Sequence, residues 1–386
     1  QIVETYLSTR QQLQWSLKNK SRELKGLDLI RTNFDYGIAS MKGNEVQFYI
    51  SLFKMLNQYD VDNLIFMISK MSIITSSRLT NFFYFLDEET EFSSFIAKYV
   101  LTKYAEVEAS KKVIEALLNK ALPTRHLLKL IKEDLNRIIN NNQGNMRMSR
   151  QLAIYQQLIT AMDRVINNHK IKLLEPELKL SFDWNKVKWA FDLWMTEQGF
   201  PDKNIEYTLF LDEGIPSNIF TELNINKIEE DCDSRDYVGL QITDMIVVLV
   251  GKLVSQITSN TRYDFNKPEQ RVLLDEKYFD LNQQQYNLIV ELNKFLLDKE
   301  TKYHFVNDAY FDETLAFQIY IGYVASFDDF EQYHKVTLNE HVEYYFHNII
   351  KFASMKYEEG IANILHAKSL YGSLKKSIEI GQSRPL

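Results

Sequence analysis

The chain has 386 residues, with 45 Lys and Arg against 52 Asp and Glu, and its formal net charge at pH 7 is −7. This length suits two or three structural units, and the acidic balance excludes a global attraction to nucleic acid while leaving room for a local basic groove. Hydrophobic residues make up 45% of the chain, which is enough for a large core and argues against disorder. The single cysteine, Cys232, excludes an internal disulfide and favours a reducing, cytoplasmic setting.

The first half of the chain is predicted to be mainly helical. Residues 1–25 have the pattern of a polar amphipathic helix with Gly26 as its C-cap, and residues 44–59 carry apolar side chains at helical spacing. Residues 63–68 form a short apolar run bounded by polar residues, which favours a buried strand. Residues 80–168 have an almost wholly helical pattern, so we expect a helical insertion there.

The second half contains one further strand. Residues 182–197 predict an amphipathic helix, residues 205–211 a strand, and residues 237–257 a long apolar helix. Polar residues interrupt the apolar run 242–254, so we interpret it as a buried helix and not as a membrane span. Three more helices are predicted after residue 260, at 281–297, 311–324 and 341–356. Few strands among many helices predict a helix-dominated α/β protein with a small parallel or mixed sheet.

The residues best suited to chemistry end the second strand and open the helix after it. Asp212 follows the apolar run of the strand, at the carboxyl end where open α/β sheets bind ligands. Asp244 lies in an apolar helix, where carboxylates are uncommon unless they are paired or metal-bound. Gln241 precedes Asp244 by three positions, on the same helix face. Magnesium prefers carboxylates, water and phosphate as ligands, so Asp212 and Asp244 together predict a magnesium site.

Each of these residues also has a purely structural interpretation. Asp212, Glu213 and Gly214 have the composition of a turn, with Glu213 facing solvent. Asp244 suits the start of a helix, where a carboxylate interacts favourably with the helix dipole. Taken singly, each residue favours the structural interpretation, whereas the two aspartates together favour a site.

The segment Asp233-Ser234 followed by Gly239-Leu240-Gln241-Ile242-Thr243-Asp244 resembles the closing motif of domain-of-unknown-function family 3800. Glu23-Leu24-Lys25 matches that family's Glu-Leu-Lys motif, and Leu211-Asp212-Glu213 matches a later strand that ends in Asp. The resemblance covers residues 1 to about 256 loosely and the tail more faintly. Only the Gly-Leu-Gln segment is specific.

The resemblance implies a ribonuclease H-like fold and a divalent-metal-dependent nuclease that hydrolyses phosphodiester bonds. The core would comprise residues 1–79 and 171–259, separated by the helical insertion at 80–170 and followed by an all-α extension at 260–386. The family usually opens with a strand ending in Asp-Glu-Ser-Gly, which is missing here. A lost central strand would leave unpaired backbone in the core, so we expect the native protein to extend upstream or another segment to supply the strand.

The resemblance also implies roles for individual residues. Asp212, Asp244 and Glu23 would be catalytic residues that hold Mg²⁺ or Mn²⁺, and Lys25 would contact phosphate or pair with Glu23. Gln241 would orient Asp244 without touching the metal. The structural alternative for Glu23 and Lys25 is a solvated helix end.

Glu213 is a reserve ligand in this scheme. The competing hypothesis is a non-catalytic interaction or regulatory subunit with a degenerate core, as in a bacterial antiviral defence or mobile-element system. In either case a protein partner or a homodimer is expected through the helical extension, where Tyr344, Tyr345 and Phe346 form an aromatic run.

Overall fold

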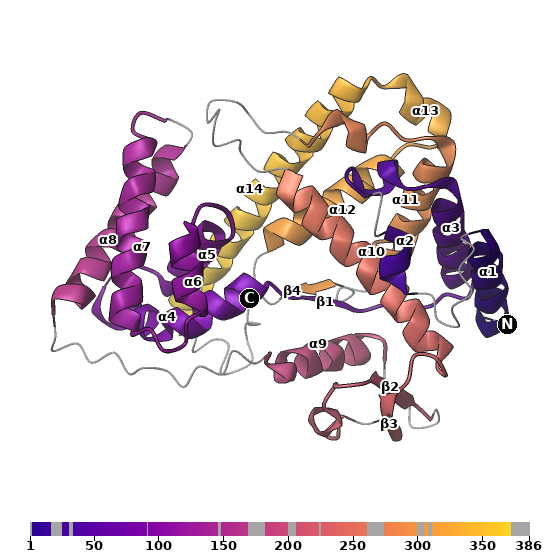
Figure 1. Cartoon of the computed structure of the whole chain (residues 1–386), viewed down its shortest axis with the longest axis horizontal. Coiled ribbons are helices and arrows are strands. Elements are labelled where there is room, and N and C mark those ends of the chain that lie inside the picture. Colours follow the sequence, from indigo (N-terminus) through magenta and orange to yellow (C-terminus); the bar gives the residue numbers. More distant parts are fainter. Residues whose placement is uncertain are drawn as a thin grey trace.

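The computed structural model describes residues 2–16, 25–30, 34–90, 92–145, 148–168, 182–199, 206–223, 225–260, 274–298, 305–307 and 311–371. Within these residues the protein is helix-dominated and contains two small parallel sheets of two strands each. Figure 1 shows two groups of helices, and a smaller unit lies below one of them. The expectation of a helix-dominated α/β protein with a small parallel sheet is therefore confirmed.

The larger group, here called the main lobe, combines the two ends of the described chain. Its helices are α1 (Ile2–Ser16), α2 (Gly26–Ile30), α3 (Gly43–Gln58), α10 (Val238–Asn260), α11 (Gln283–Leu296), α12 (Phe311–Ala325), α13 (Phe330–Lys335) and α14 (Leu338–Tyr371), with short 3₁₀ helices η1 (Gly37–Ser40) and η4 (Glu276–Tyr278). One hydrophobic core joins α3 to α11, where the rings of Phe53 and Phe295 lie 5.6 Å apart. The helices expected at 44–59, 281–297 and 311–324 are confirmed.

The second group, here called the helical lobe, has a hydrophobic core of its own. It contains α4 (Lys70–Glu89), α5 (Ser94–Val107), α6 (Lys111–Leu118), α7 (Thr124–Asn141) and α8 (Ser149–Asn167). In these helices, as in α7 and α8, the apolar residues recur at helical spacing, so one face of the helix is buried. A buried carboxylate, Asp134, accepts hydrogen bonds from Tyr104 (2.7 Å) and the backbone of Ser110 (2.9 Å), which satisfies polar groups inside this lobe.

The smaller unit packs one helix against a two-stranded sheet. It consists of α9 (Trp184–Glu197), β2 (Thr208–Asp212), the 3₁₀ helix η3 (Ser217–Ile219) and β3 (Lys227–Cys232), with β2 and β3 parallel. Leu211 points into the small core that this sheet shares with α9, and the alternate residues of β2 are exposed. The strand and helix expected at 205–211 and 182–197 are confirmed.

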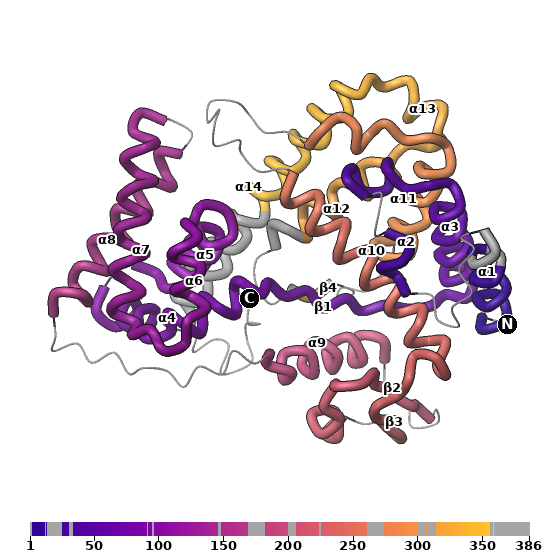
Figure 2. Tube along the Cα trace, in the orientation of Figure 1, coloured from indigo at the N-terminus to yellow at the C-terminus, as the bar shows by residue number. Residues whose placement is uncertain are grey.

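The other sheet joins distant parts of the chain. Strand β1 (Ile65–Met67) pairs in parallel with β4 (Phe305–Asn307), between the two lobes in Figure 2. The strand expected at 63–68 is thus confirmed. The extension after residue 260, expected to be all-α, contributes β4 and is therefore not wholly helical.

Helix α10 passes through the main lobe. It is long and apolar enough to cross a membrane by length and composition alone, with a mean hydropathy of 1.7 over its most apolar window. Met245, Leu249 and Leu253 are buried in the core of the main lobe, together with residues of α3 and α12. Helix α10 is therefore a core helix of this fold, as its sequence predicted.

Candidate functional site

Asp212 is the last residue of β2, and its neighbour across the sheet is the last residue of β3. The pairing runs from Phe210 with Glu229 to Asp212 with Cys232, so β3 holds one additional residue in this interval. Asp231 lies in this bulge with a φ of 49°, a backbone conformation that Asp tolerates better than most residues. The bulge therefore sets the direction of the chain where β3 ends and Asp233 follows. Because Cys232 pairs with Asp212, β3 ends beside this exposed aspartate.

The turn after β3 is held by its own charged residues and by α10. Arg235 donates through Nε to both carboxylate oxygens of Asp233, at 2.9 and 2.7 Å. These hydrogen bonds, with a smaller contribution from the charge of Lys25, lower the pKa of Asp233 to about 2. The carbonyl of Ser234 accepts a hydrogen bond of 2.6 Å from Nε2 of Gln241. The turn is therefore fixed against the first turns of α10.

Asp244 connects α10 to a segment that lies 218 positions earlier in the chain. Its Oδ2 accepts a hydrogen bond of 2.9 Å from the backbone N–H of Gly26, which opens α2. The first N–H groups of a helix have no partner within the helix, and a carboxylate can accept a hydrogen bond from one of them. Asp244 therefore acts as a cap for α2. The described residues form no other hydrogen bond to Asp244, and its side chain is exposed at the helix surface.

Gly26 fits against α10 because it has no side chain. A Cβ at this position would lie 2.8 Å from Cβ of Val248 and 3.2 Å from the carbonyl oxygen of Asp244. The expectation that Gly26 ends the first helix is wrong, because Gly26 is the first residue of α2 and is buried. The glycine is required by this close approach and not by a left-handed C-cap.

The predicted site residues are thus brought together only in part. Lys25 and Gly26 lie at the turn and at Asp244, whereas Glu23 lies outside the described residues. Gln241 was expected to orient Asp244, and its amide hydrogen-bonds to the carbonyl of Ser234 and to Arg10.

Glu213 is exposed, and its backbone N–H donates to Oδ1 of Asp212 at 3.0 Å. This hydrogen bond belongs to the turn that was the structural alternative for both residues. Among the described residues, no group of three or more His, Cys, Asp or Glu side chains is placed to hold a metal ion. A magnesium ion commonly uses only one or two carboxylates and completes its shell with water and phosphate, so the exposed Asp212 and Asp244 retain suitable ligand chemistry.

Two residues that the sequence analysis did not single out lie next to the predicted site residues on α10. Arg10 of α1 donates through Nη1 to Oε1 of Gln241 at 2.6 Å, across 231 positions of the chain. Arg10 occurs in a polar helix without a motif around it, so no sequence signal could have found it. Tyr49 of α3 lies beside α10, where burial and the charge of Asp244 both raise its pKa.

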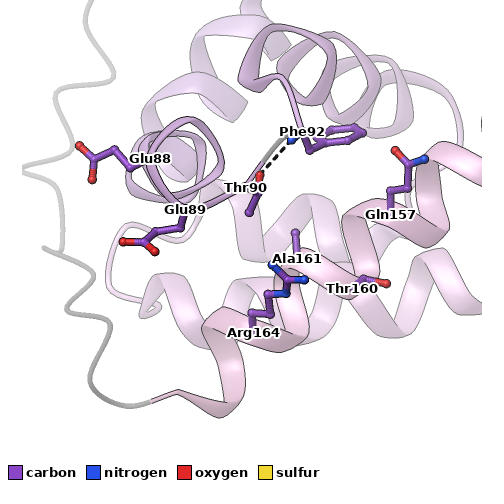
Figure 3. A pocket seen from close by; sticks show the side chains of 8 residues that line it. All are labelled: Glu88, Glu89, Thr90, Phe92, Gln157, Thr160, Ala161 and Arg164. Carbon is purple, nitrogen blue, oxygen red and sulfur yellow. Dashed lines mark hydrogen bonds between the residues drawn. The ribbon is translucent and has the colours of Figure 1, made fainter.

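The helical lobe contains a separate cavity of about 860 Å³. It is lined by the end of α4, the segment after it, and α8, with Glu88, Glu89, Phe92 and Arg164 around its rim (Figure 3). Within its wall the backbone N–H of Phe92 donates to Oγ1 of Thr90 at 3.1 Å. None of the residues predicted to carry chemistry lines this cavity, which is largely open to solvent.

The aromatic run of the extension is divided between surface and core. Tyr344 is exposed, whereas Tyr345 is buried and donates to the carbonyl of Ala316 at 3.1 Å. A docking surface made of all three aromatic residues is therefore excluded, because neighbouring residues of α14 point in different directions.

Neither a protein-family model, nor a curated protein, nor a solved structure matches this chain. The function of this chain is therefore inferred from its own residues and contacts.

Proposed function

We propose that this chain is a divalent-metal-dependent nuclease with a ribonuclease H-like core, in which Asp212, Asp244 and Glu23 hold Mg²⁺ or Mn²⁺. The observation that carries the proposal is the hydrogen bond between the N–H of Gly26 and Asp244, at 2.9 Å. It joins the segment that follows Glu23-Leu24-Lys25 to the helix of the closing motif. Gly26 and Asp244 are 218 positions apart, and a nuclease of this kind needs the two motifs at one place.

Three further features support the same proposal. Asp212 lies at the carboxyl end of a parallel strand, beside a bulge whose backbone conformation is uncommon. Lys25 is exposed and its charge acts on Asp233, so the turn carries positive charge of the kind that attracts a phosphate. Only Oδ2 of Asp244 accepts a hydrogen bond from a described residue, so Oδ1 is left to bind a cation.

When bound, the metal would polarise a phosphodiester and lower the pKa of a water molecule. The protein's own residues would hold that site in place: Asp212 and Asp244 as carboxylate ligands, Lys25 as a phosphate contact and Gln241 through the Ser234 turn. Glu213 remains a reserve ligand. The substrate in this proposal is nucleic acid, and the single, buried Cys232 suits a cytoplasmic setting.

The proposal is tested by cleavage of single-stranded and duplex DNA and RNA in Mg²⁺ or Mn²⁺. Asp212→Asn and Asp244→Asn should each abolish cleavage while leaving the thermal unfolding transition in place, since Asn can still accept the hydrogen bonds from the N–H groups of Glu213 and Gly26, respectively. Asp192→Asn, an exposed acid on α9, is the matched control and should retain activity. Full activity in Asp212→Asn or Asp244→Asn would refute a catalytic metal site at these aspartates, and no cleavage by the wild-type chain would refute the nuclease.

A non-catalytic interaction or regulatory subunit is the second candidate. It is favoured by one observation, that no group of three metal-binding side chains occurs among the described residues. In this case α14 would contact a partner protein or a second copy, and its exposed Tyr344, Phe352 and Met355 would contribute. Nucleic-acid cleavage would then be absent from the wild-type chain as well as from the variants.

A further inference from the structure

Arg10 is held at the candidate site by a buried amide. The side chain of Gln241 is only 4% exposed, and both ends of its amide are hydrogen-bonded. Because Nε2 donates to the carbonyl of Ser234, Oε1 is the atom that accepts from Nη1 of Arg10. Gln241 therefore fixes a guanidinium group from α1 against the turn that leads from β3 into α10.

The guanidinium of Arg10 is not neutralised by a carboxylate within the described part of the chain. Its Nε is shielded from solvent and lacks a hydrogen-bond partner among the described residues. Burying a charged donor without a partner is costly, so such groups are uncommon unless a ligand completes them. Among the described residues the hydrogen-bond partner of Arg10 is the neutral amide of Gln241, which does not neutralise the guanidinium charge and engages only one of its donors.

The place of Arg10 indicates what would complete it. Gln241 lies one helical turn before Asp244, and the charge of Lys25 acts on Asp233 in the same turn after β3. Guanidinium groups bind phosphate through two parallel N–H bonds, which gives both charge and orientation. We propose that Arg10 contacts a phosphate of the nucleic-acid substrate, and that Gln241 is the positioning residue that holds its guanidinium there.

This inference rests on the proposed function for its substrate class. The structural alternative is that the hydrogen bond between Arg10 and Gln241 only ties α1 to α10. The two differ in one measurable quantity, because each phosphate contact releases counterions and adds to the salt dependence of binding. A merely structural residue changes stability and leaves that dependence unchanged.

The test measures binding of a fluorescein-labelled single-stranded DNA oligonucleotide by anisotropy, with EDTA present to prevent cleavage, over a series of salt concentrations. Arg10→Gln should weaken binding about tenfold and reduce the slope of log K against log salt by about 0.7. Gln241→Ala should weaken binding in the same direction, because the guanidinium is released. Arg10→Lys keeps the charge and should show a smaller loss with nearly the wild-type slope.

Arg150→Gln removes the same charge from an exposed position of α8 and is the matched control. Equal weakening by Arg10→Gln and Arg150→Gln, an unchanged slope in Arg10→Gln, or no binding by the wild-type chain would each overturn the inference. If Arg10→Gln fails to fold, the comparison of Gln241→Ala with Arg150→Gln gives the same decision. Arg10-dependent binding without metal-dependent cleavage would refute the nuclease and leave the phosphate contact standing.

Discussion

The contact of Gly26 with α10 gives the most direct prediction about stability. In Gly26→Ala the new methyl group would meet Cβ of Val248 at 2.8 Å and Cγ2 of the same residue at 3.1 Å. Both atoms belong to a β-branched side chain on a packed helix, so they cannot rotate away and α2 must shift. Overpacking of this kind costs about 1–3 kcal/mol.

An opposing effect must be subtracted. Alanine favours a helix over glycine by about 1 kcal/mol in a helix interior, and by less at the first residue of α2. We therefore expect Gly26→Ala to lower the free energy of unfolding by about 1–2 kcal/mol. The shift also lengthens the hydrogen bond from the Gly26 N–H to Asp244, so cleavage activity should fall with stability.

Gly251→Ala on α10 is the control for helix propensity. Apart from its chain neighbours and the backbone of its own helix, no atom lies within 4 Å of a Cβ built at Gly251, which is exposed in the middle of that helix. This variant should raise the free energy of unfolding by about 0.5–1 kcal/mol. Chemical denaturation of both variants checks the pair, and a Gly26→Ala protein as stable as Gly251→Ala would refute the packing of α2 on α10.

Two further predictions concern buried polar groups. His341 is 1% exposed, its Nδ1 lies 2.8 Å from the hydroxyl of Tyr323, and burial lowers its pKa below the usual 6.5. Between the folded pKa and 6.5 the unfolded chain therefore binds more protons than the folded chain, so the free energy of unfolding should decrease as the pH falls through this range. Urea denaturation at several pH values should show a smaller decrease of the unfolding free energy in His341→Gln. In the helical lobe, Asp134→Ala should lower the free energy of unfolding by about 2–3 kcal/mol, because it leaves the buried hydroxyl of Tyr104 unpaired. Arg137→Ala should lower it by less, because the Arg137 side chain is half-exposed. Equal losses of unfolding free energy in urea denaturation would contradict this.

The long elements of this fold could be predicted because their apolar residues recur at regular spacing. Helices α3, α9, α10 and α11 begin and end within a few residues of the expected positions. Strand β3 could not be found, because Lys-Ile-Glu-Glu-Asp-Cys has no alternation of apolar residues. Strand β4 has three residues and depends on pairing with a segment more than two hundred positions earlier.

The candidate site was predictable where it is local. Gln241 and Asp244 share a helix face by spacing alone, and Asp212 ends a strand that its apolar run defines. The role of Gly26 and the contribution of Arg10 depend on contacts across 218 and 231 positions, which no local pattern encodes. The ribonuclease H-like arrangement and the role of Glu23 remain proposals.

Calorimetric titration with Mn²⁺ tests the central claim most directly, because it measures the metal site without requiring a substrate. The account predicts saturable binding at millimolar metal or below by the wild-type chain, and loss of that binding in both Asp212→Asn and Asp244→Asn. Asp192→Asn should bind as the wild type does. Wild-type heats that remain unchanged in Asp212→Asn and Asp244→Asn would contradict a shared metal site at these two aspartates.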